Sequence, residues 1–279
     1  MQTINCKGTL IDLATPKVMG IINVTPDSFY DGGATTLESQ IINQAALMLD
    51  QGATFLDLGG YSSRPGATDI SQQVEINRVI PAIKAIIKAF PKTLISIDTF
   101  RSEVAKQAVN AGACMVNDIS AGKLDPQMLE TIGELQIPYC MMHMRGTPQT
   151  MKTLTDYSNI TKQVLFYFSE RVAAARSYNI NDIIVDPGFG FAKTTDQNFE
   201  LLNHLELFDS LDLPLLAGVS RKSMVYKTLD ISPKEALNGT TALHMVALQK
   251  GARILRVHDV QPATECIKLF EQLNTAMSN

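Results

Sequence analysis

Short apolar runs that each end on a polar or ionisable residue recur along nearly the whole chain, usually with an amphipathic stretch between them. A buried strand does not keep a charge in its middle, but it can present one where it emerges from the sheet. Repetition of this pattern predicts parallel strands whose carboxyl ends converge on one pocket. The seven runs are MGIIN to Asn23, TFLDLG through Asp57, LISID to Asp98, CMVND to Asn117 and Asp118, DIIVD to Asp186, PLLAGVSRK to Lys222, and RILRVH through Arg256 and His258.

The stretches between the runs have helical periodicity, so strands and helices are expected to alternate. Strands are predicted near residues 18–23, 54–58, 93–98, 114–117, 138–142, 182–186, 214–218 and 253–257. Helices are predicted near residues 37–51, 71–89, 102–111, 126–136, 157–178, 196–208, 233–250 and 261–275. A capping box at Ser232-Pro233-Lys234-Glu235 marks the start of the seventh helix. Residues 2–12 alternate weakly around a Lys-Gly turn and predict a short hairpin before the first unit.

The units follow one another without a linker or a shift in composition, which favours one domain over residues 1–279. Their number and the chain length predict a single (β/α)8 TIM barrel with a short N-terminal hairpin. A doubly wound sheet is the alternative, because a sequence pattern does not reveal whether a sheet closes. Three loops after strands are long (residues 24–36, 59–69 and 144–156), and such loops usually build the site of a barrel enzyme.

Composition narrows the class of protein. The chain has 279 residues, is 45% hydrophobic and carries a net charge of −4, so no basic surface points to a nucleic-acid partner. No apolar run approaches the roughly 18 residues of a membrane span, and the N-terminus lacks the pattern of a secretory signal. The four cysteines show no CxxC spacing and are interpreted as reduced. We therefore expect a cytoplasmic protein without a membrane partner.

Three of the strand-end residues suit a flat heterocycle. Asp98 and Asp186 carry carboxylates that only accept hydrogen bonds, and Asn117 carries an amide that both donates and accepts. Three such groups in one cavity match a ring that offers NH and amino donors. Each residue alone would be better explained as a cap for the following helix. Their occurrence at matching strand ends favours ligand binding. Asp57 and Asp118 are expected to be structural.

Cationic residues follow the last two strands. Arg256 and His258 leave the eighth strand with their side chains on the same face, at the place where barrels often bind phosphate. Arginine binds phosphate oxygens in pairs, and histidine adds a further donor. Lys222 follows the seventh strand, where a solvated loop cation is the simpler interpretation. His143 ends the fifth strand and could line the pocket, but it has no predicted role.

Metal and nucleophilic chemistry receive less support. The histidines form no HxH or HExxH motif, so a zinc hydrolase site is not indicated. Asn23 offers one hard oxygen, which suits only Mg²⁺ that takes its other ligands from water and a substrate phosphate. Ser62, Ser63 and Ser223 have no partnering base evident in the sequence, so nucleophilic catalysis is not indicated.

Eight segments in order resemble the dihydropteroate synthases, a family of pterin-binding TIM barrels. The resemblance covers residues 17–260, and although each motif alone is weak, eight in register are specific. It implies a homodimeric transferase of folate synthesis, which joins a dihydropterin methyl diphosphate to 4-aminobenzoate and is a sulfonamide target. The segments are MGIINVTPDSF, SSRPG, SIDTF, VNDIS, MHMRGTP, DPGFGFAK, GVSRKS and RVHDV.

The resemblance also implies roles for individual residues. It makes Asp98, Asn117, Asp186 and Lys222 the pterin-binding set, and Ser63, Arg64, Arg256 and His258 the diphosphate-binding set. It makes Phe29, Pro65, Phe189, Lys222 and Ser223 the 4-aminobenzoate-binding set, and it makes Asn23 the Mg²⁺ contact. Lys222, Asp98 and Arg256 are the expected catalytic residues. Ser63 stands where the family more often has Thr, which keeps the hydroxyl. The reaction is expected to be SN1-like, with Mg²⁺-assisted departure of diphosphate.

Two other functions stay open. A pterin-dependent methyltransferase barrel would share the Asp and Asn residues, but it should not need the DSF, SSRPG and SRKS segments together. A non-catalytic pterin-binding paralogue would tend to lose the loop residues or the diphosphate ligands. This chain retains Arg64, Lys222, Arg256 and His258.

Overall fold

Eight parallel strands close into a barrel in the computed structural model, which describes residues 3–25, 34–63 and 68–277. The barrel closes because the last strand pairs with both its predecessor and the first barrel strand. The TIM-barrel prediction is therefore confirmed, and the doubly wound alternative is wrong. The strands are β3 (Lys17–Asn23), β4 (Phe55–Gly59), β5 (Leu94–Asp98), β6 (Met115–Asp118), β7 (Tyr139–Met142), β8 (Ile183–Asp186), β9 (Leu215–Ala217) and β10 (Ala252–Val257).

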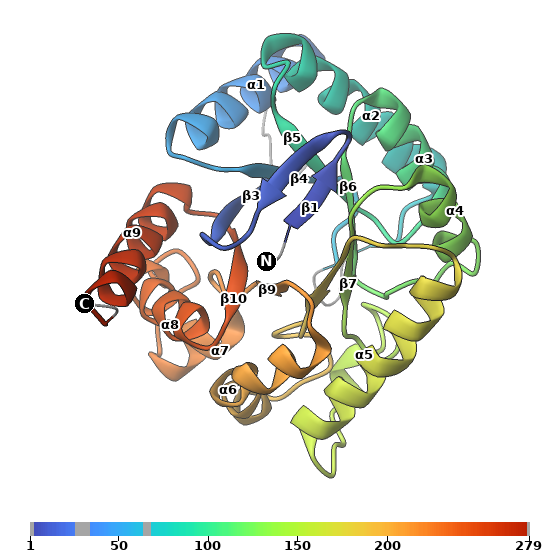
Figure 1. The fold of residues 1–279 in the computed structure, drawn as a ribbon. Helices are drawn as coiled ribbons and strands as arrows, with labels where there is room; N and C mark the ends of the chain where they lie inside the picture. Colours follow the sequence, from blue (N-terminus) through green and yellow to red (C-terminus); the bar gives the residue numbers. More distant parts are fainter. Residues whose placement is uncertain (1–2, 26–33, 64–67, 278–279) are drawn as a thin grey trace.

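Helices form a ring around this barrel (Figure 1). Among the described residues, no helix is long and apolar enough to cross a lipid bilayer. The helices are α1 (Ala34–Asp50), α2 (Gln72–Ala89), α3 (Ser102–Ala111), α4 (Met128–Leu135), α5 (Ile160–Ser177), α6 (Thr195–Asn203), α7 (Ser223–Thr228), α8 (Leu237–Gln249) and α9 (Val260–Met277), with short 3₁₀ segments η2 (Met151–Thr153) and η3 (Leu205–Leu211).

Two predictions about helices are corrected. The seventh predicted helix begins at Leu237 rather than at residue 233. The Ser232-Glu235 pair instead closes a turn ahead of it, in which the Ser232 amide and hydroxyl both donate to Glu235 Oε2, at 3.0 and 2.7 Å. The short helix α7, directly after Lys222, was not predicted. Six residues are too few to show helical periodicity.

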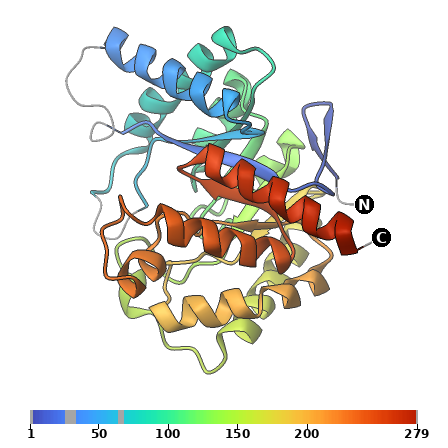
Figure 2. The same cartoon turned by 90° about the vertical axis from the view of Figure 1, so that its left-hand side faces the viewer.

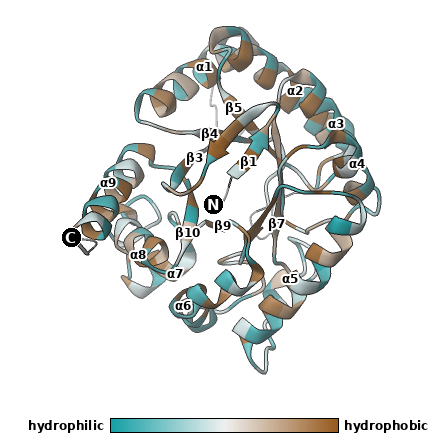
Figure 3. Cartoon of the chain, in the orientation of Figure 1, coloured by the Kyte–Doolittle hydropathy of each residue, from teal (hydrophilic) through white to brown (hydrophobic). Residues whose placement is uncertain are grey.

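Alternation along the strands separates two apolar cores. Residues such as Leu56, Ile97 and Val116 face outward and pack with the helices in the large core between the two layers. Residues such as Phe55 and Met115 face the barrel interior instead. In Figure 3 the strands are largely hydrophobic, whereas the helices carry both hydrophobic and hydrophilic positions, as expected when one face of a helix meets solvent.

The N-terminal hairpin closes one end of the barrel. Its strands β1 (Thr3–Cys6) and β2 (Thr9–Asp12) pair antiparallel, which confirms the predicted hairpin. Ile4 and Cys6 are buried against the interior residues at the strand beginnings, and the Asn5 amide donates to Asp182 Oδ2, 3.1 Å away, at the start of β8. Figure 2 shows the hairpin at one end of the barrel. The half of the barrel interior near the strand beginnings, here called the lower half, is thus filled with apolar side chains. A functional site can therefore form only in the other half, at the carboxyl ends of the strands.

We predict that Gly133→Ala destabilises the protein. At an exposed position inside a helix, alanine usually stabilises the helix by about 1 kcal/mol relative to glycine. However, a Cβ at Gly133 would lie 2.3 Å from the backbone oxygen of Tyr178, so α4 and the end of α5 would have to separate. We expect a net loss of about 1–3 kcal/mol in the free energy of unfolding, measured by urea denaturation. Glu134→Ala, on the exposed side of the same helix, is the control. A stabilised Gly133→Ala protein would contradict the close approach.

Candidate functional site

The upper half of the barrel interior is polar because the inward positions change from apolar to polar toward the strand ends. Phe55, Met115, Ile184 and Ile254 fill the lower interior. Two residues further along the same strands, and therefore on the same inward face, come Asp57, Asn117, Asp186 and Arg256. Asp98, at the end of β5, pairs in register with Asn117. Five of the polar strand-end residues therefore converge on one space.

Arg256 lies at the centre of this cluster. Its Nε donates to Asp57 Oδ2 and its Nη2 donates to Asp98 Oδ2, and the donor–acceptor distance is 2.6 Å in both hydrogen bonds. Asn117 Nδ2 also donates to Asp57 Oδ2, at 3.1 Å. Asp57 is fully buried, and its Oδ1 has no hydrogen-bond partner within the described residues. Asp57, which was expected to be merely structural, therefore belongs to the site and orients Arg256.

Burial controls the charge states in the cluster. Burial opposes the charge of Arg256, but Asp57 and Asp98 outweigh it and raise the pKa of the guanidinium. Burial raises the pKa of Asp98 to about 7, against the opposing effect of Arg256. Burial also raises the pKa of Asp186, against the Gly188 amide that donates to its Oδ1 at 2.8 Å. The cation is fixed, and the carboxylates around it are strongly desolvated.

His258 lies beyond Arg256, at the exposed rim. Its Nδ1 is 3.1 Å from Ser220 Oγ, and its backbone N–H donates to the same oxygen over 3.2 Å. Partial burial and the charges of Arg256 and Lys222 lower the pKa of His258, so the imidazole is neutral at neutral pH. Arg256 and His258 therefore offer a charged and a neutral donor side by side, as expected from their spacing in the sequence.

Lys222 approaches the cluster from the other side. Its Nζ lies 4.5 Å from the centre of the Phe191 ring, and its charge opposes the rise in the pKa of Asp186. Phe189 was expected to lie near Lys222, in the 4-aminobenzoate-binding set. The structure does not place it there: Phe189 is 1% exposed and packs in the core between strands and helices. The aromatic residue that faces Lys222 is Phe191.

Three further predicted residues, Asn23, Ser63 and Ser223, lie around the same rim. Asn23, half-buried at the end of β3, pairs in register with Gly59, which itself pairs with Asp98. Ser63 is half-buried in the loop after β4, and Ser223 is the first residue of α7. The predicted residues Phe29, Arg64 and Pro65 lie outside the described residues.

Asp118, by contrast, faces away from the barrel interior. Its Oδ1 accepts from the amide and hydroxyl of Ser120, and its Oδ2 accepts from the Gly122 amide and the Tyr139 hydroxyl, all within 2.8 Å. These bonds hold the loop after β6. The structural role expected for Asp118 agrees with this arrangement.

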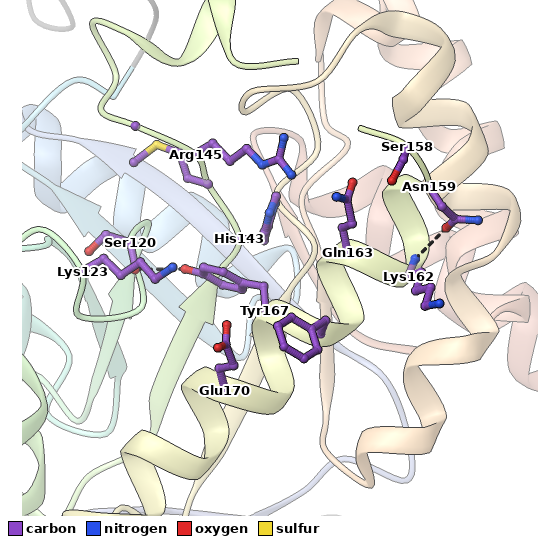
Figure 4. Close-up of a pocket in the computed structure, with 13 residues that line it drawn as sticks. Ser120, Lys123, His143, Arg145, Ser158, Asn159, Lys162, Gln163, Tyr167 and Glu170 are labelled. Carbon is purple, nitrogen blue, oxygen red and sulfur yellow. Dashed lines mark hydrogen bonds between the residues drawn. The ribbon is translucent and has the colours of Figure 1, made fainter. Parts of the chain in front are cut away.

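A separate cavity of about 570 Å³ lies outside the barrel, between the loop after β7 and helix α5. Figure 4 shows His143, Arg145, Gln163 and Tyr167 around it. None of the strand-end residues around Arg256 lines it. The charged residues that line this cavity form no ion pairs with one another among the described residues, whereas Arg256 is held between two carboxylates in the strand-end cluster. We therefore assign the functional site to the strand ends.

Comparison with known proteins agrees with the architecture and its polar rim. The family described as "Pterin binding enzyme" matches residues 19–258. The dihydropteroate synthase of Escherichia coli (strain K12) is 42% identical over 98% of this chain and 97% of its own length. The chain belongs to the dihydropteroate synthase family of pterin-binding enzymes. The family membership predicted from the sequence is thereby confirmed.

Solved dihydropteroate synthases share the whole fold. The Yersinia pestis enzyme in complex with a sulfonamide drug superposes with a TM-score of 0.92 at 38% identity, and the match covers 98% of this chain and 100% of the other. The Xanthomonas albilineans enzyme in complex with 7,8-dihydropteroate superposes with a TM-score of 0.88 at 34% identity, with 98% of each chain covered. Both comparisons extend over the barrel and its N-terminal hairpin.

We predict that Arg256→Ala destabilises the ligand-free protein by about 3–5 kcal/mol, because it leaves the buried carboxylate of Asp57 without its cation. In the double variant Arg256→Ala/Asp57→Asn, that charge is removed as well, and we expect more than half of the lost stability to return. Urea denaturation measures both variants. Arg253→Ala, on the same strand near the closed end of the barrel, is the control. A double variant no more stable than Arg256→Ala would refute the pairing.

Proposed function

We propose that the strand-end cluster binds a dihydropterin methyl diphosphate and joins its methylene carbon to the amino nitrogen of 4-aminobenzoate, with release of diphosphate. The observation that carries this proposal is the placement of Arg256, fixed between two carboxylates and beside Asn117 in a buried polar layer. Such a layer provides acceptors for a donor-rich heterocycle and a cation for its leaving group. A related enzyme from Xanthomonas albilineans binds 7,8-dihydropteroate, which contains such a heterocycle.

The pterin ring is assigned to Asn117 and Asp186. Because Asn117 Nδ2 donates to Asp57, the amide presents its Oδ1 as an acceptor. Because Asp186 Oδ1 accepts from Gly188, its Oδ2 is directed toward a ligand. Gly218 supports this assignment, since a Cβ there would be 3.9 Å from Asp186 Oδ2 and would take space next to it. Two acceptors above an apolar floor suit a flat ring that carries NH and amino groups.

Diphosphate departure is assigned to Arg256 and His258. Two of the five N–H donors of the guanidinium are engaged by Asp57 and Asp98. The other donors, and the neutral imidazole of His258, can bind phosphate oxygens as negative charge builds up on them. The bond between the methylene carbon and the bridging oxygen breaks, and its electron pair leaves with the diphosphate. An arginine already held in place stabilises that charge without reorganising.

Substitution by a protein nucleophile has little support. Cys140 faces the barrel interior within this part of the fold, but it is fully buried. Burial, with the charges of Asp186 and Asp57, raises the pKa of its thiol well above the usual value, so the reactive thiolate is suppressed. We propose that departure of diphosphate precedes attack by the arylamine, because the resulting pterin cation is stabilised by conjugation and by the nearby Asp98 and Asp186.

The arylamine then attacks from the side of Lys222 and Phe191. The Phe191 ring provides an apolar face for the benzoate ring, and the Lys222 ammonium and the Ser223 hydroxyl can receive the carboxylate. The nitrogen lone pair forms the new bond to the methylene carbon, and the nitrogen then loses a proton to solvent or to the departing diphosphate. An aniline nitrogen is already nucleophilic, so a strong general base is not needed.

We include Mg²⁺ in the proposal, with Asn23 as its protein ligand. Within the described residues, no three His, Cys, Asp or Glu side chains come together to form a metal site of their own. One amide oxygen at the rim fits an ion that takes its other ligands from water and substrate phosphate. When bound, the ion would neutralise part of the charge of the leaving diphosphate.

We also propose that the chain forms a homodimer in the cytoplasm. Leu269 and Leu273, one turn apart on α9, are 62% and 50% exposed, and such an apolar stripe suits a second copy of the chain. All four cysteines are unpaired and buried, which suits a reducing compartment. Sedimentation equilibrium should give a dimer for the natural chain and a weaker one for Leu269→Lys/Leu273→Lys. A natural chain that sediments as a monomer would contradict the proposal.

The activity is tested by mixing the protein with the dihydropterin diphosphate, 4-aminobenzoate and Mg²⁺. Diphosphate release should require both organic substrates and should match the formation of dihydropteroate mole for mole. Folded protein that binds the pterin but releases no diphosphate would favour a non-catalytic paralogue.

Asp186→Asn extends this test to the pterin site. The substitution replaces an acceptor with a group that also donates, so the KM for the pterin substrate should rise about tenfold or more, as expected when a buried hydrogen bond is lost. Asp182→Asn, directly before the opposite end of the strand, is the matched control and should leave that KM within about twofold. Equal effects of the two variants would remove Asp186 from the site.

A further inference from the structure

Lys193 is a buried lysine that has no role in the proposed chemistry. It lies at the end of the loop between β8 and α6 and is 8% exposed. No carboxylate of the described residues forms an ion pair with it. Lysine is among the residues least often found in this state, so a retained buried ammonium calls for an explanation.

The surroundings of Lys193 Nζ match an ammonium group. It lies 2.8 Å from the backbone oxygen of Gly188, 3.0 Å from that of Phe191 and 3.0 Å from Nδ1 of His143. Three acceptors face the three N–H donors of the ammonium. Burial lowers the pKa of His143 well below its usual value, so this imidazole is neutral and its Nδ1 can accept. Burial also lowers the pKa of Lys193 itself, to about 7, and the charge of Asp186 opposes that decrease.

The contacts of Lys193 tie together two separate elements. Gly188 and Phe191 belong to the loop after β8, whereas His143 directly follows β7. The His143 ring is itself held edge-on against Tyr167 of α5, with 4.8 Å between the ring centres, and Figure 4 shows the two side by side. Lys193 therefore fastens a loop to a rigid part of the barrel wall.

This loop needs such a tie because of its backbone. Gly188 and Gly190 have φ values of +70° and +83°, and Ala192 has a φ of +49°, which is a costly conformation for alanine. A second tie lies on the other side of the loop, where the Gly190 amide donates to Asn198 Oδ1 at 2.6 Å. Without its ties, a chain with two glycines would have many alternatives to this conformation.

The same loop forms one wall of the proposed arylamine subsite. The Phe191 ring centre is 4.5 Å from Lys222 Nζ, and a Cβ at Gly190 would lie 3.4 Å from Lys222 Cδ. We propose that Lys193 is a positioning residue for 4-aminobenzoate: by tying Gly188 and Phe191 to His143, it holds the Phe191 ring against Lys222. This inference rests on the proposed function and assigns a determinant of its second substrate.

Loss of the Lys193 contacts should weaken binding of the arylamine part of the ligand more than binding of the pterin part. Asp186, assigned to the pterin, belongs to strand β8 and is fixed by the sheet, where the His143 amide donates to its backbone oxygen over 2.9 Å. Phe191 lies beyond the sheet and depends on the ties of the loop. The Asp186 side chain accepts from the Gly188 amide, which lies only two residues beyond the strand. Loss of the Lys193 contacts should therefore displace Phe191 more than Asp186.

Lys193→Met tests the proposal, because it keeps the length of the side chain and removes its donors. Isothermal titration measures the affinity for 7,8-dihydropteroate, which carries both halves, and for the dihydropterin alcohol, which carries the pterin alone. We expect the dihydropteroate Kd to rise at least tenfold and the dihydropterin Kd to change less than about twofold. Because binding is the readout, the result does not depend on turnover, and failure of the proposed activity would show separately as absent diphosphate release. Lys162→Met, an exposed lysine on α5, is the matched control.

Variants of His143 provide a second, independent test. Asparagine can place an acceptor near the position of Nδ1, whereas phenylalanine cannot. His143→Asn should therefore keep dihydropteroate affinity closer to that of the natural chain than His143→Phe does. The positioning role would be overturned if Lys193→Met lost affinity equally for both ligands, or for neither. It would also be overturned if the two His143 variants bound dihydropteroate with the same affinity.

Discussion

The site depends on one interaction, the pairing of Arg256 with Asp57 and Asp98 inside the barrel. A buried guanidinium is costly unless carboxylates offset the loss of solvent, and buried carboxylates are equally costly without a cation. Each group therefore requires the others, and together they fix the geometry of the polar layer. Asn117, which donates to Asp57, is oriented as a consequence. The binding surface that we propose for a heterocycle and its leaving group thus depends on a single charge arrangement.

The barrel makes this arrangement possible because its apolar interior residues and its polar residues occupy different levels along the barrel axis. The hairpin and the apolar interior residues fill the lower half, so the strands there need no polar partners. Parallel strands then deliver side chains from distant parts of the chain to one rim, and Asp57 and Arg256 meet although 199 residues separate them. Loops supply the residues that we propose to surround the second substrate, and Phe191 and Lys222 come from two of these loops. These loop residues are thereby supported by a rigid layer of strand-end residues.

Much of this could be predicted from the sequence, because periodicity marks strands and their ends. Asp98, Asn117, Asp186 and Arg256 were found in this way. The alternation also places Asp57 inward, two positions after Phe55, but a pattern does not reveal its partner. The prediction of Phe189 as a site residue failed because Phe189 lies in a loop, where the alternation of a strand no longer applies. After Asp186, left-handed glycines turn the chain, so Phe191 rather than Phe189 faces Lys222, and no periodic rule anticipates that.

The decisive experiment is a crystal structure of the chain with the dihydropterin diphosphate and an analogue of 4-aminobenzoate that lacks the amino group, such as 4-methylbenzoate. Our account predicts the pterin edge against Asn117 Oδ1 and Asp186 Oδ2. It predicts the diphosphate on Arg256 and His258, with the Asp57–Arg256 pair retained. A pterin bound instead in the cavity between the loop after β7 and helix α5, or a diphosphate without contact to Arg256, would contradict the account.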